Sequence, residues 1–284
     1  MAANGPSITA QRAAMIRSAH QILDEPRIFD DPLALRIIGA ETSAALQATP
    51  QQFTAAPGSD ILRAFIAARS RYAEDILGEA VRRGLRQYVI LGAGLDTFAY
   101  RNPYKQTRLR VFEVDHPATQ SWKRAQLEAA GIFIPATLTF VPVDFETQAM
   151  ANGLRHANFD HGEPAFFSWL GVTPYLTGEA IASTLKFIAN LKTGSCVVFD
   201  YVISPSLLNP QQRSAFDDLS KRVAMAGEPW QTFFDPSSLA ADLKAFGFAE
   251  ALDLGPDEIN ARYFTGRNDN LKVRGFGHIM KAIV

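Results

Sequence analysis

Three short apolar runs, each followed by glycines or an acid, most restrict the folds open to this chain. The run at 88–91 breaks into Gly92 and Gly94, and two later runs end in Asp115 and Asp144. Continuous apolar runs of this length are typical of strands buried on both faces of a parallel sheet. The pattern predicts an open α/β sheet with a nucleotide- or nucleoside-binding pocket along the carboxyl ends of its strands.

Beyond residue 88, strand-like and helix-like segments alternate, which requires a mostly parallel sheet with right-handed crossovers. Prolines at 205, 210 and 229 interrupt this alternation, so we expect a lid or substrate-facing insertion there. The expected strands are 88–91, 110–114, 138–143, 165–169 and 195–201, with two last strands near 260–267 and 275–283, and the expected helices are 117–130, 178–191 and 237–246.

The N-terminal part of the chain is predicted to be helical in pieces. Residues 10–23 carry apolar side chains at helical spacing, and a second short helix can begin at Leu33. The longest predicted helix is 59–83, which leads directly into the first strand. Two prolines and a glycine in the segment 47–59 indicate a loop or a frayed helix.

Composition narrows the classes of partner. A formal net charge of −1 gives no overall electrostatic reason to expect binding to nucleic acid or to an anionic membrane. No apolar span approaches the ~20 residues of a membrane helix, and no signal peptide is evident. The single Cys196 excludes an internal disulfide and a multi-cysteine zinc site. We expect a cytoplasmic protein with no metal and a small-molecule partner, and the sequence leaves the oligomeric state open.

The glycine turn alone fits more than one ligand. A dinucleotide fingerprint has a third small residue where this chain has Thr97, which disfavours NAD. Asp115 is compatible with NAD and with an adenosine ligand that lacks a pyrophosphate, because either ligand needs an acid for its ribose hydroxyls. An adenosine ligand without a pyrophosphate also needs a polar group near the adenine. Asp144 suits that role, with Phe145 packing against the ring.

Three ordered blocks make the chain recognisable. They are Leu91-Gly-Ala-Gly-Leu-Asp-Thr97 with Tyr100-Arg101, Val111-Phe-Glu-Val-Asp-His-Pro117, and Val141-Pro-Val-Asp-Phe145. Together they resemble the leucine carboxyl methyltransferase-like family, most closely its bacterial branch of S-adenosylmethionine-dependent O-methyltransferases. The resemblance extends over most of the chain, from Thr9-Ala10 to Tyr263-Phe-Thr-Gly-Arg267.

This resemblance implies a class I methyltransferase fold. Such a fold is α/β and Rossmann-like, with seven mostly parallel strands, the last inserted antiparallel, an N-terminal helical cap and a lid. We therefore expect a single domain, 1–284. Its parts would be a cap at 1–58, a cofactor-binding core at 59–201, a lid at 202–235 and a C-terminal part of the core at 236–284.

The resemblance also implies S-adenosyl-L-methionine as the cofactor and assigns residues to its parts. Gly92 and Gly94 would approach the methionine part of the cofactor. Asp115 would bind the ribose, and Asp144 with Phe145 would hold the adenine.

Charged and aromatic residues around these positions complete the expected site. Arg69 matches the family arginine that pairs with the cofactor carboxylate, although its neighbour Arg71 stays an alternative. Arg17 is the best match for a basic residue of the first helix. The family often has a Glu where this chain has Leu170, which predicts a more apolar site. Tyr175 is the candidate catalytic residue.

Methyl transfer from a sulfonium requires an acceptor oxygen about 3 Å from the methyl carbon and in line with the departing sulfur. A carboxylate acceptor needs no general base, whereas a hydroxyl would benefit from one. The chain offers no Asp-His pair at a diagnostic spacing, so we expect catalysis by positioning and desolvation under the lid. Trp230 and the Phe233-Phe234 pair are expected to shape an apolar wall. The alternatives are an NAD-dependent oxidoreductase and a non-catalytic S-adenosylmethionine-binding protein.

Overall fold

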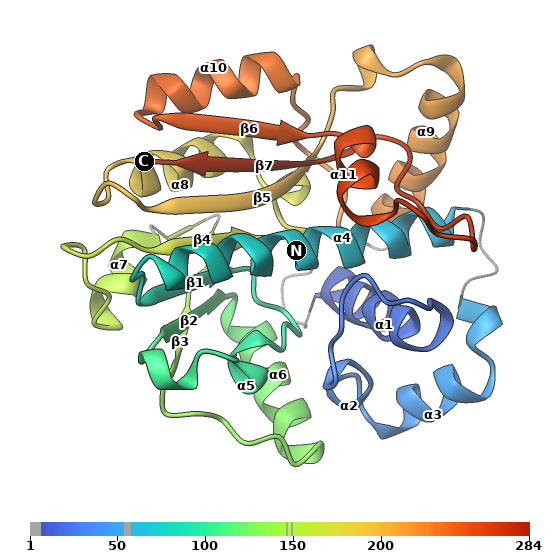
Figure 1. Ribbon diagram of the computed structural model, residues 1–284, viewed down its shortest axis with the longest axis horizontal. Helices are drawn as coiled ribbons and strands as arrows, with labels where there is room; N and C mark the ends of the chain where they lie inside the picture. The colour runs from blue at the N-terminus through green and yellow to red at the C-terminus, as the bar shows by residue number, and fades with distance from the viewer. Residues whose placement is uncertain (1–6, 54–57, 146, 149, 226) are drawn as a thin grey trace.

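A computed structural model describes residues 7–53, 58–145, 147–148, 150–225 and 227–284. These residues form a seven-stranded sheet with the order β3-β2-β1-β4-β5-β7-β6, and helices pack on both of its faces (Figure 1). The strands are β1 (Gln87–Leu91), β2 (Arg110–Asp115), β3 (Leu138–Pro142), β4 (Phe166–Trp169), β5 (Cys196–Val202), β6 (Glu250–Leu254) and β7 (Gly277–Ile283).

The pairing of these strands confirms the expected methyltransferase topology. β1 pairs in parallel with β2 and β4, β2 with β3, and β4 with β5. β7 lies between β5 and β6 and is antiparallel to both. The sheet is therefore mostly parallel, with its last strand inserted antiparallel.

Eleven helices among the described residues cover the sheet and its ends. Apolar side chains of α4, α5 and α11 pack on one face of the sheet, and those of α7, α8 and α10 pack on the other. No helix in the described ranges combines the length and apolar character needed to cross a bilayer. The helices are α1 (Ile8–Leu23), α2 (Ala34–Ile37), α3 (Ala40–Ala48), α4 (Ser59–Arg82), α5 (Phe98–Arg101), α6 (Pro117–Ala129), α7 (Met150–His156), α8 (Gly178–Ala189), α9 (Pro210–Met225), α10 (Pro236–Phe246) and α11 (Pro256–Tyr263).

Two helical segments, 8–48 and 210–225, lie near the carboxyl ends of the parallel strands. The helices α1, α2 and α3 of the first lie beside the N-terminal half of α4, and α9 of the second lies at the same end of the sheet (Figure 1). The expected insertion after the fifth strand thus contains a long helix. In the segment 47–59, residues 50–53 form a 3-10 turn, and 54–57 lie outside the described residues.

The C-terminal part corrects one expectation. Half of the predicted strand at 260–267 belongs to helix α11 and the rest is not strand, and the sixth strand is β6, which the sequence pattern did not indicate. β6 lies at the sheet edge and its first three residues are exposed, so it lacks the apolar run of a central strand. Pro256 starts α11, and the Glu258 carboxylate accepts the N–H of Gly255 at 3.1 Å.

Candidate cofactor and acceptor site

A cavity of about 470 Å³ lies at the carboxyl ends of the central strands, within the usual volume range of small-molecule sites. The chain segments after β1, β2, β3 and β4 line one side of it. Residues of α1 and the segment 228–231 line the other. Open α/β sheets bind ligands at this edge, beside the point where the strand order reverses. Here that point lies between β1 and β4, because the chain continues from β1 to β2 on one side and from β4 to β5 on the other. The expected pocket is therefore present.

The glycine turn after β1 is shaped by close packing. Gly92 and Gly94 both have positive φ, at 65° and 44°. A Cβ on Gly92 would lie 2.3 Å from Cγ2 of Val172, and one on Gly94 would lie 3.1 Å from Cβ of Ala10. Larger residues at either position would strain the backbone and push away a cavity wall. The turn therefore needs glycine for its geometry.

Asp115 is fixed against this turn. Its Oδ2 accepts the N–H of Gly94 at 2.6 Å, and its Oδ1 accepts the N–H of His116 at 2.7 Å. Burial raises the pKa of Asp115, although these two backbone hydrogen bonds oppose the rise. A carboxylate oxygen can accept more than one hydrogen bond, so Asp115 can still receive ligand hydroxyls.

The residues expected at the adenine also reach the cavity. Asp144 and Phe145 line it directly after β3. The Asp144 carbonyl accepts the N–H of Thr147 and of Gln148, which forms a tight turn around these residues. Phe145 is buried, and its ring centre lies 6.4 Å from that of Trp169. The structure thus places a carboxylate and an aromatic ring together beyond the β2 acid.

Arg69 enters the cavity from α4 and is held by an acid that the sequence did not indicate. Its Nη1 donates to Oδ2 of Asp200 at 2.7 Å, while Oδ1 of Asp200 accepts the N–H of Gly171 at 2.5 Å. A Cβ on Gly171 would lie 2.6 Å from Nη2 of Arg69, and its φ is 74°. The Nε atom is buried with no hydrogen-bond partner among the described residues. Arg71, the alternative, instead pairs with Asp75 and does not line the cavity.

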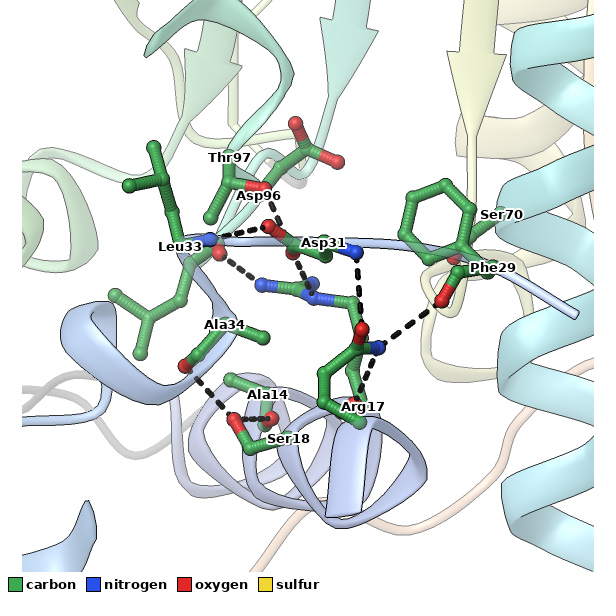
Figure 2. Close-up of polar contacts among 12 residues, drawn as sticks. Ala14, Arg17, Ser18, Phe29, Asp31, Leu33, Ala34, Ser70, Asp96 and Thr97 are labelled. Carbon is green, nitrogen blue, oxygen red and sulfur yellow. Dashed lines mark hydrogen bonds and ion pairs between the residues drawn. The ribbon is translucent and has the colours of Figure 1, made fainter. Parts of the chain in front are cut away.

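Arg17 connects the cap to the glycine turn. Its Nη2 donates to the carbonyl of Leu95 at 2.6 Å, and its Nε lies 2.9 Å from Oδ2 of Asp31. Figure 2 shows Asp31 between Arg17, Thr97 and the backbone of Leu33. Thr97, which breaks the dinucleotide fingerprint, donates its hydroxyl to this buried carboxylate at 2.7 Å.

Tyr175 lies in the short 3-10 helix after β4 and lines the cavity. Burial raises its pKa, which a hydrogen bond with the Trp230 side chain and the charge of Arg69 only partly oppose. Tyr175 is therefore a neutral phenol, suited to donate a hydrogen bond but not to remove a proton. Leu170 also lines the cavity and gives this wall the apolar character expected from the missing glutamate.

The aromatic wall predicted from the lid is absent from the cavity. Trp230 and Phe233 pack instead around Phe216 of α9, with ring centres 5.6 Å and 5.3 Å from it. Phe234 contacts Tyr201 of β5. These rings join the lid to the body of the protein, and they do not appear among the residues that line the cavity.

Sequence reasoning also missed Glu228. This buried residue lines the cavity, and its Oε2 accepts the N–H of Thr9 at 2.9 Å. Its backbone partner lies 219 positions away in the chain, so no local motif marks it.

Comparisons with known proteins agree with this geometry. Residues 10–189 match the family model described as leucine carboxyl methyltransferase. YktD of Bacillus subtilis (strain 168), provisionally named an S-adenosyl-L-methionine-dependent methyltransferase, is 33% identical over 303 aligned positions, which cover 100% of this chain and 99% of YktD. A provisionally named methyltransferase of the same kind from Mycobacterium marinum is 32% identical over 218 positions, or 76% of this chain and 70% of the relative.

A solved structure from Thermobifida fusca YX, titled provisionally as a methyltransferase, shares the fold. Its TM-score is 0.59 at 19% identity, and the match covers 98% of this chain and 95% of that one.

Proposed function

The chain belongs to the leucine carboxyl methyltransferase family and is an S-adenosyl-L-methionine-dependent methyltransferase, and we propose that it methylates an oxygen of a small-molecule acceptor. The observation that carries this proposal is that one cavity has both a polar wall suited to the cofactor and an apolar wall suited to an acceptor. Asp115, Asp144 and Phe145 suit an adenosine, and they adjoin an apolar wall that includes Leu170 and Tyr175.

The cofactor would lie across the strand ends. Asp115 would accept hydrogen bonds from the ribose hydroxyls, and Asp144 would accept one from the adenine amine. Phe145 would pack against the adenine ring. The side-chain-free surface of Gly92 and Gly94 would face the methionine part.

Arg69 would bind the carboxylate of the methionine part. Asp200 already fixes one edge of its guanidinium, and Arg69 lines the cavity beside the glycine turn. A guanidinium can bind two carboxylates through different N–H groups. The pairing with Asp200 thus supports a pre-positioned Arg69 and does not compete with this role.

Bound S-adenosylmethionine would supply the methyl group from its sulfonium to the acceptor oxygen and would leave as S-adenosylhomocysteine, with the electrons of the S–CH₃ bond on sulfur. A carboxylate acceptor has no proton to lose, whereas a hydroxyl acceptor would release its proton to solvent. Residues of the cavity would align the acceptor oxygen and exclude water. Tyr175, as a neutral phenol beside this wall, would orient the acceptor by donating a hydrogen bond.

We further propose a single domain over 1–284, with a cap at 1–58, a core at 59–201, a lid at 202–235 and a C-terminal part of the core at 236–284. The hydrogen bonds from α1 to the core, from the lid to the core and from α1 to the lid support a single domain. Cytoplasmic location and the absence of nucleic-acid and membrane partners also remain proposals, which cell fractionation and binding assays test.

Calorimetric titration with S-adenosylhomocysteine and with NADH tests the cofactor. We expect binding of the former only, and binding of NADH alone would overturn the proposal. A methyl-transfer screen against small carboxylic acids and phenols, with a protein C-terminal peptide as control, tests the acceptor. In the same assay, Tyr175→Phe should slow transfer without changing affinity for S-adenosylhomocysteine, and an unchanged rate would remove Tyr175 from the site.

A further inference from the structure

Glu228 brings a buried carboxylate from the lid into the cofactor cavity. The residue is 7% exposed and follows α9, near the start of the segment that crosses the cavity. Its Oε2 accepts the N–H of Thr9 at 2.9 Å, in the first turn of α1. One backbone N–H satisfies only part of a carboxylate, which offers about four acceptor positions.

This carboxylate has no cationic partner in the described part of the chain. No Lys, Arg or His nitrogen there forms an ion pair with it, although glutamate is rarely buried unless it is paired. Two other acids of the cavity differ in this respect. Asp115 lies in the field of Lys123 and His116, and Asp96 lies in that of Arg101. Glu228 is therefore built to meet a positive charge that a ligand brings.

The surroundings of Glu228 locate that charge at the methionine end of the cavity. Its partner Thr9 adjoins Ala10, whose Cβ packs 3.1 Å from the Cβ position of Gly94. Arg69, Tyr175 and Glu228 all line this cavity, and the charges of Arg69 and Glu228 both influence the pKa of Tyr175.

Opposite charges on Arg69 and Glu228 match the two charges of an amino-acid group. An α-amino acid presents a carboxylate and an ammonium on adjacent bonds. Arg69 suits the carboxylate, and Glu228 suits the ammonium as a charge-assisted hydrogen-bond acceptor. Leu170 and the other residues after β4 that line the cavity include no acid, so this wall cannot supply the charge.

We propose that Glu228 binds the α-ammonium of S-adenosylmethionine from the lid and replaces the acid missing at Leu170. This inference rests on the proposed placement of the methionine part between Arg69 and the glycine turn. Because the same carboxylate holds the first turn of α1, bound cofactor would join lid, cap and core through one side chain.

The test is a double-mutant cycle in which the Glu228 charge is removed from the protein and the ammonium charge is removed from the ligand. The probes are S-adenosylhomocysteine and its deaminated analogue 4-(adenosin-5′-ylthio)butanoate, which keeps the carboxylate and lacks the ammonium. Wild-type protein should bind S-adenosylhomocysteine at least about tenfold more tightly than the analogue. Glu228→Gln can still accept the Thr9 N–H, and it should reduce this ratio to near one.

Glu258→Gln is the matched control. The Glu258 carboxylate also accepts a backbone N–H at a helix start, but it does not line the cavity. This variant should keep the wild-type ratio, and a change in it would overturn the inference by showing that the ratio responds to distant glutamates.

The remaining outcomes separate the inference from the proposed function. A Glu228→Gln protein with the wild-type ratio overturns the inference. If that protein also methylates more slowly, Glu228 faces the acceptor instead. Failure of wild-type protein to bind S-adenosylhomocysteine would overturn the proposed function itself. Arg69→Gln tests the placement alone, because it should weaken both probes and leave 5′-methylthioadenosine, which lacks the amino-acid part, unaffected.

Discussion

The two sides of the cavity are held in place by different means. The floor, formed by residues 90–96, 115–116 and 144–145, continues the parallel strands, and backbone N–H groups hold its acid Asp115. The cover, formed by α1 and residues 228–231, is held partly by side chains that reach distant backbone atoms. Arg17 reaches Leu95, 78 positions away, and Glu228 reaches Thr9, 219 positions away. The Gln231 N–H also donates to the Pro174 carbonyl at 2.6 Å. Strand pairing thus fixes the floor, whereas a few hydrogen bonds between segments far apart in the sequence fasten the cover.

Buried charges follow the same division. Under the floor, Glu113 of β2 pairs with Lys123 of α6 at 2.7 Å, and both side chains are 1% exposed. Beside the cover, the buried Asp31 contacts Arg17, Arg101, the Thr97 hydroxyl and the Leu33 N–H. Among the described residues, loss of Lys123 would therefore leave the Glu113 side chain only a long contact with the Tyr100 hydroxyl, whereas loss of one partner leaves Asp31 well satisfied.

The largest expected effect comes from breaking the pair under the floor. Lys123→Met should lower the free energy of unfolding by about 3–5 kcal/mol at pH 8, because it leaves a buried carboxylate unpaired. Urea denaturation followed by circular dichroism measures this loss. The double variant Lys123→Met/Glu113→Leu should recover most of it. A single-variant loss below about 1 kcal/mol would contradict this account of the pair.

Asp115→Ala tests the floor as a binding surface. It should weaken binding of S-adenosylhomocysteine by about 1–3 kcal/mol, because hydrogen bonds to the ribose are lost. Calorimetric titration measures the change, and Asp253→Asn on β6, remote from the cavity, is its control. Unchanged affinity would remove Asp115 from the ribose site.

Arg17→Met tests the cover. It should lower the free energy of unfolding by only about 1–2 kcal/mol, because Asp31 keeps its other partners. Hydrogen exchange should accelerate in α1 and stay unchanged in β1. If this variant is destabilised as strongly as Lys123→Met, the floor and the cover are equally fixed and the distinction fails.

The smallest expected effect is a change in how the free energy of unfolding depends on pH. Burial raises the pKa of Glu113 to about 7, although Lys123 opposes the rise. At pH values between the ordinary pKa of Glu113 and about 7, this carboxyl group is protonated in the folded protein and ionised in the unfolded chain. Its stabilising contribution is therefore complete below the ordinary value and is lost as pH rises through about 7. Wild-type protein should lose more stability from pH 5 to pH 8 than Glu113→Gln does, and parallel losses would contradict the assignment.

Local pattern was enough to predict the floor. An apolar run followed by a glycine or an acid identifies a buried strand and its carboxyl end, and parallel strands bring those ends to one edge. Asp115 and Asp144 could be assigned to one site because each ends such a run. Arg69 required the family resemblance as well, because an arginine on a long helix has no distinctive local pattern.

The cover could not be predicted from local sequence pattern in the same way. Asp200, Asp31 and Glu228 acquire their roles from partners brought close only by the tertiary fold. The prediction of an aromatic wall was wrong because Trp230 packs against Phe216 and Phe276, and its local sequence does not distinguish such packing from lining a cavity. The exposed edge strand β6 likewise lacks the apolar pattern by which the central strands were recognised.

The placement of β7 between β5 and β6 affects how the protein emerges from the ribosome. The first five strands can pair with one another as soon as they are made, because each has a neighbour already synthesised or soon to follow. In the described sheet β6 has only β7 as a neighbour, and 22 residues, 255–276, separate the two strands. Nascent chains that stop before residue 277 would thus carry an unpaired strand. We expect them to be the species that chaperones bind during synthesis.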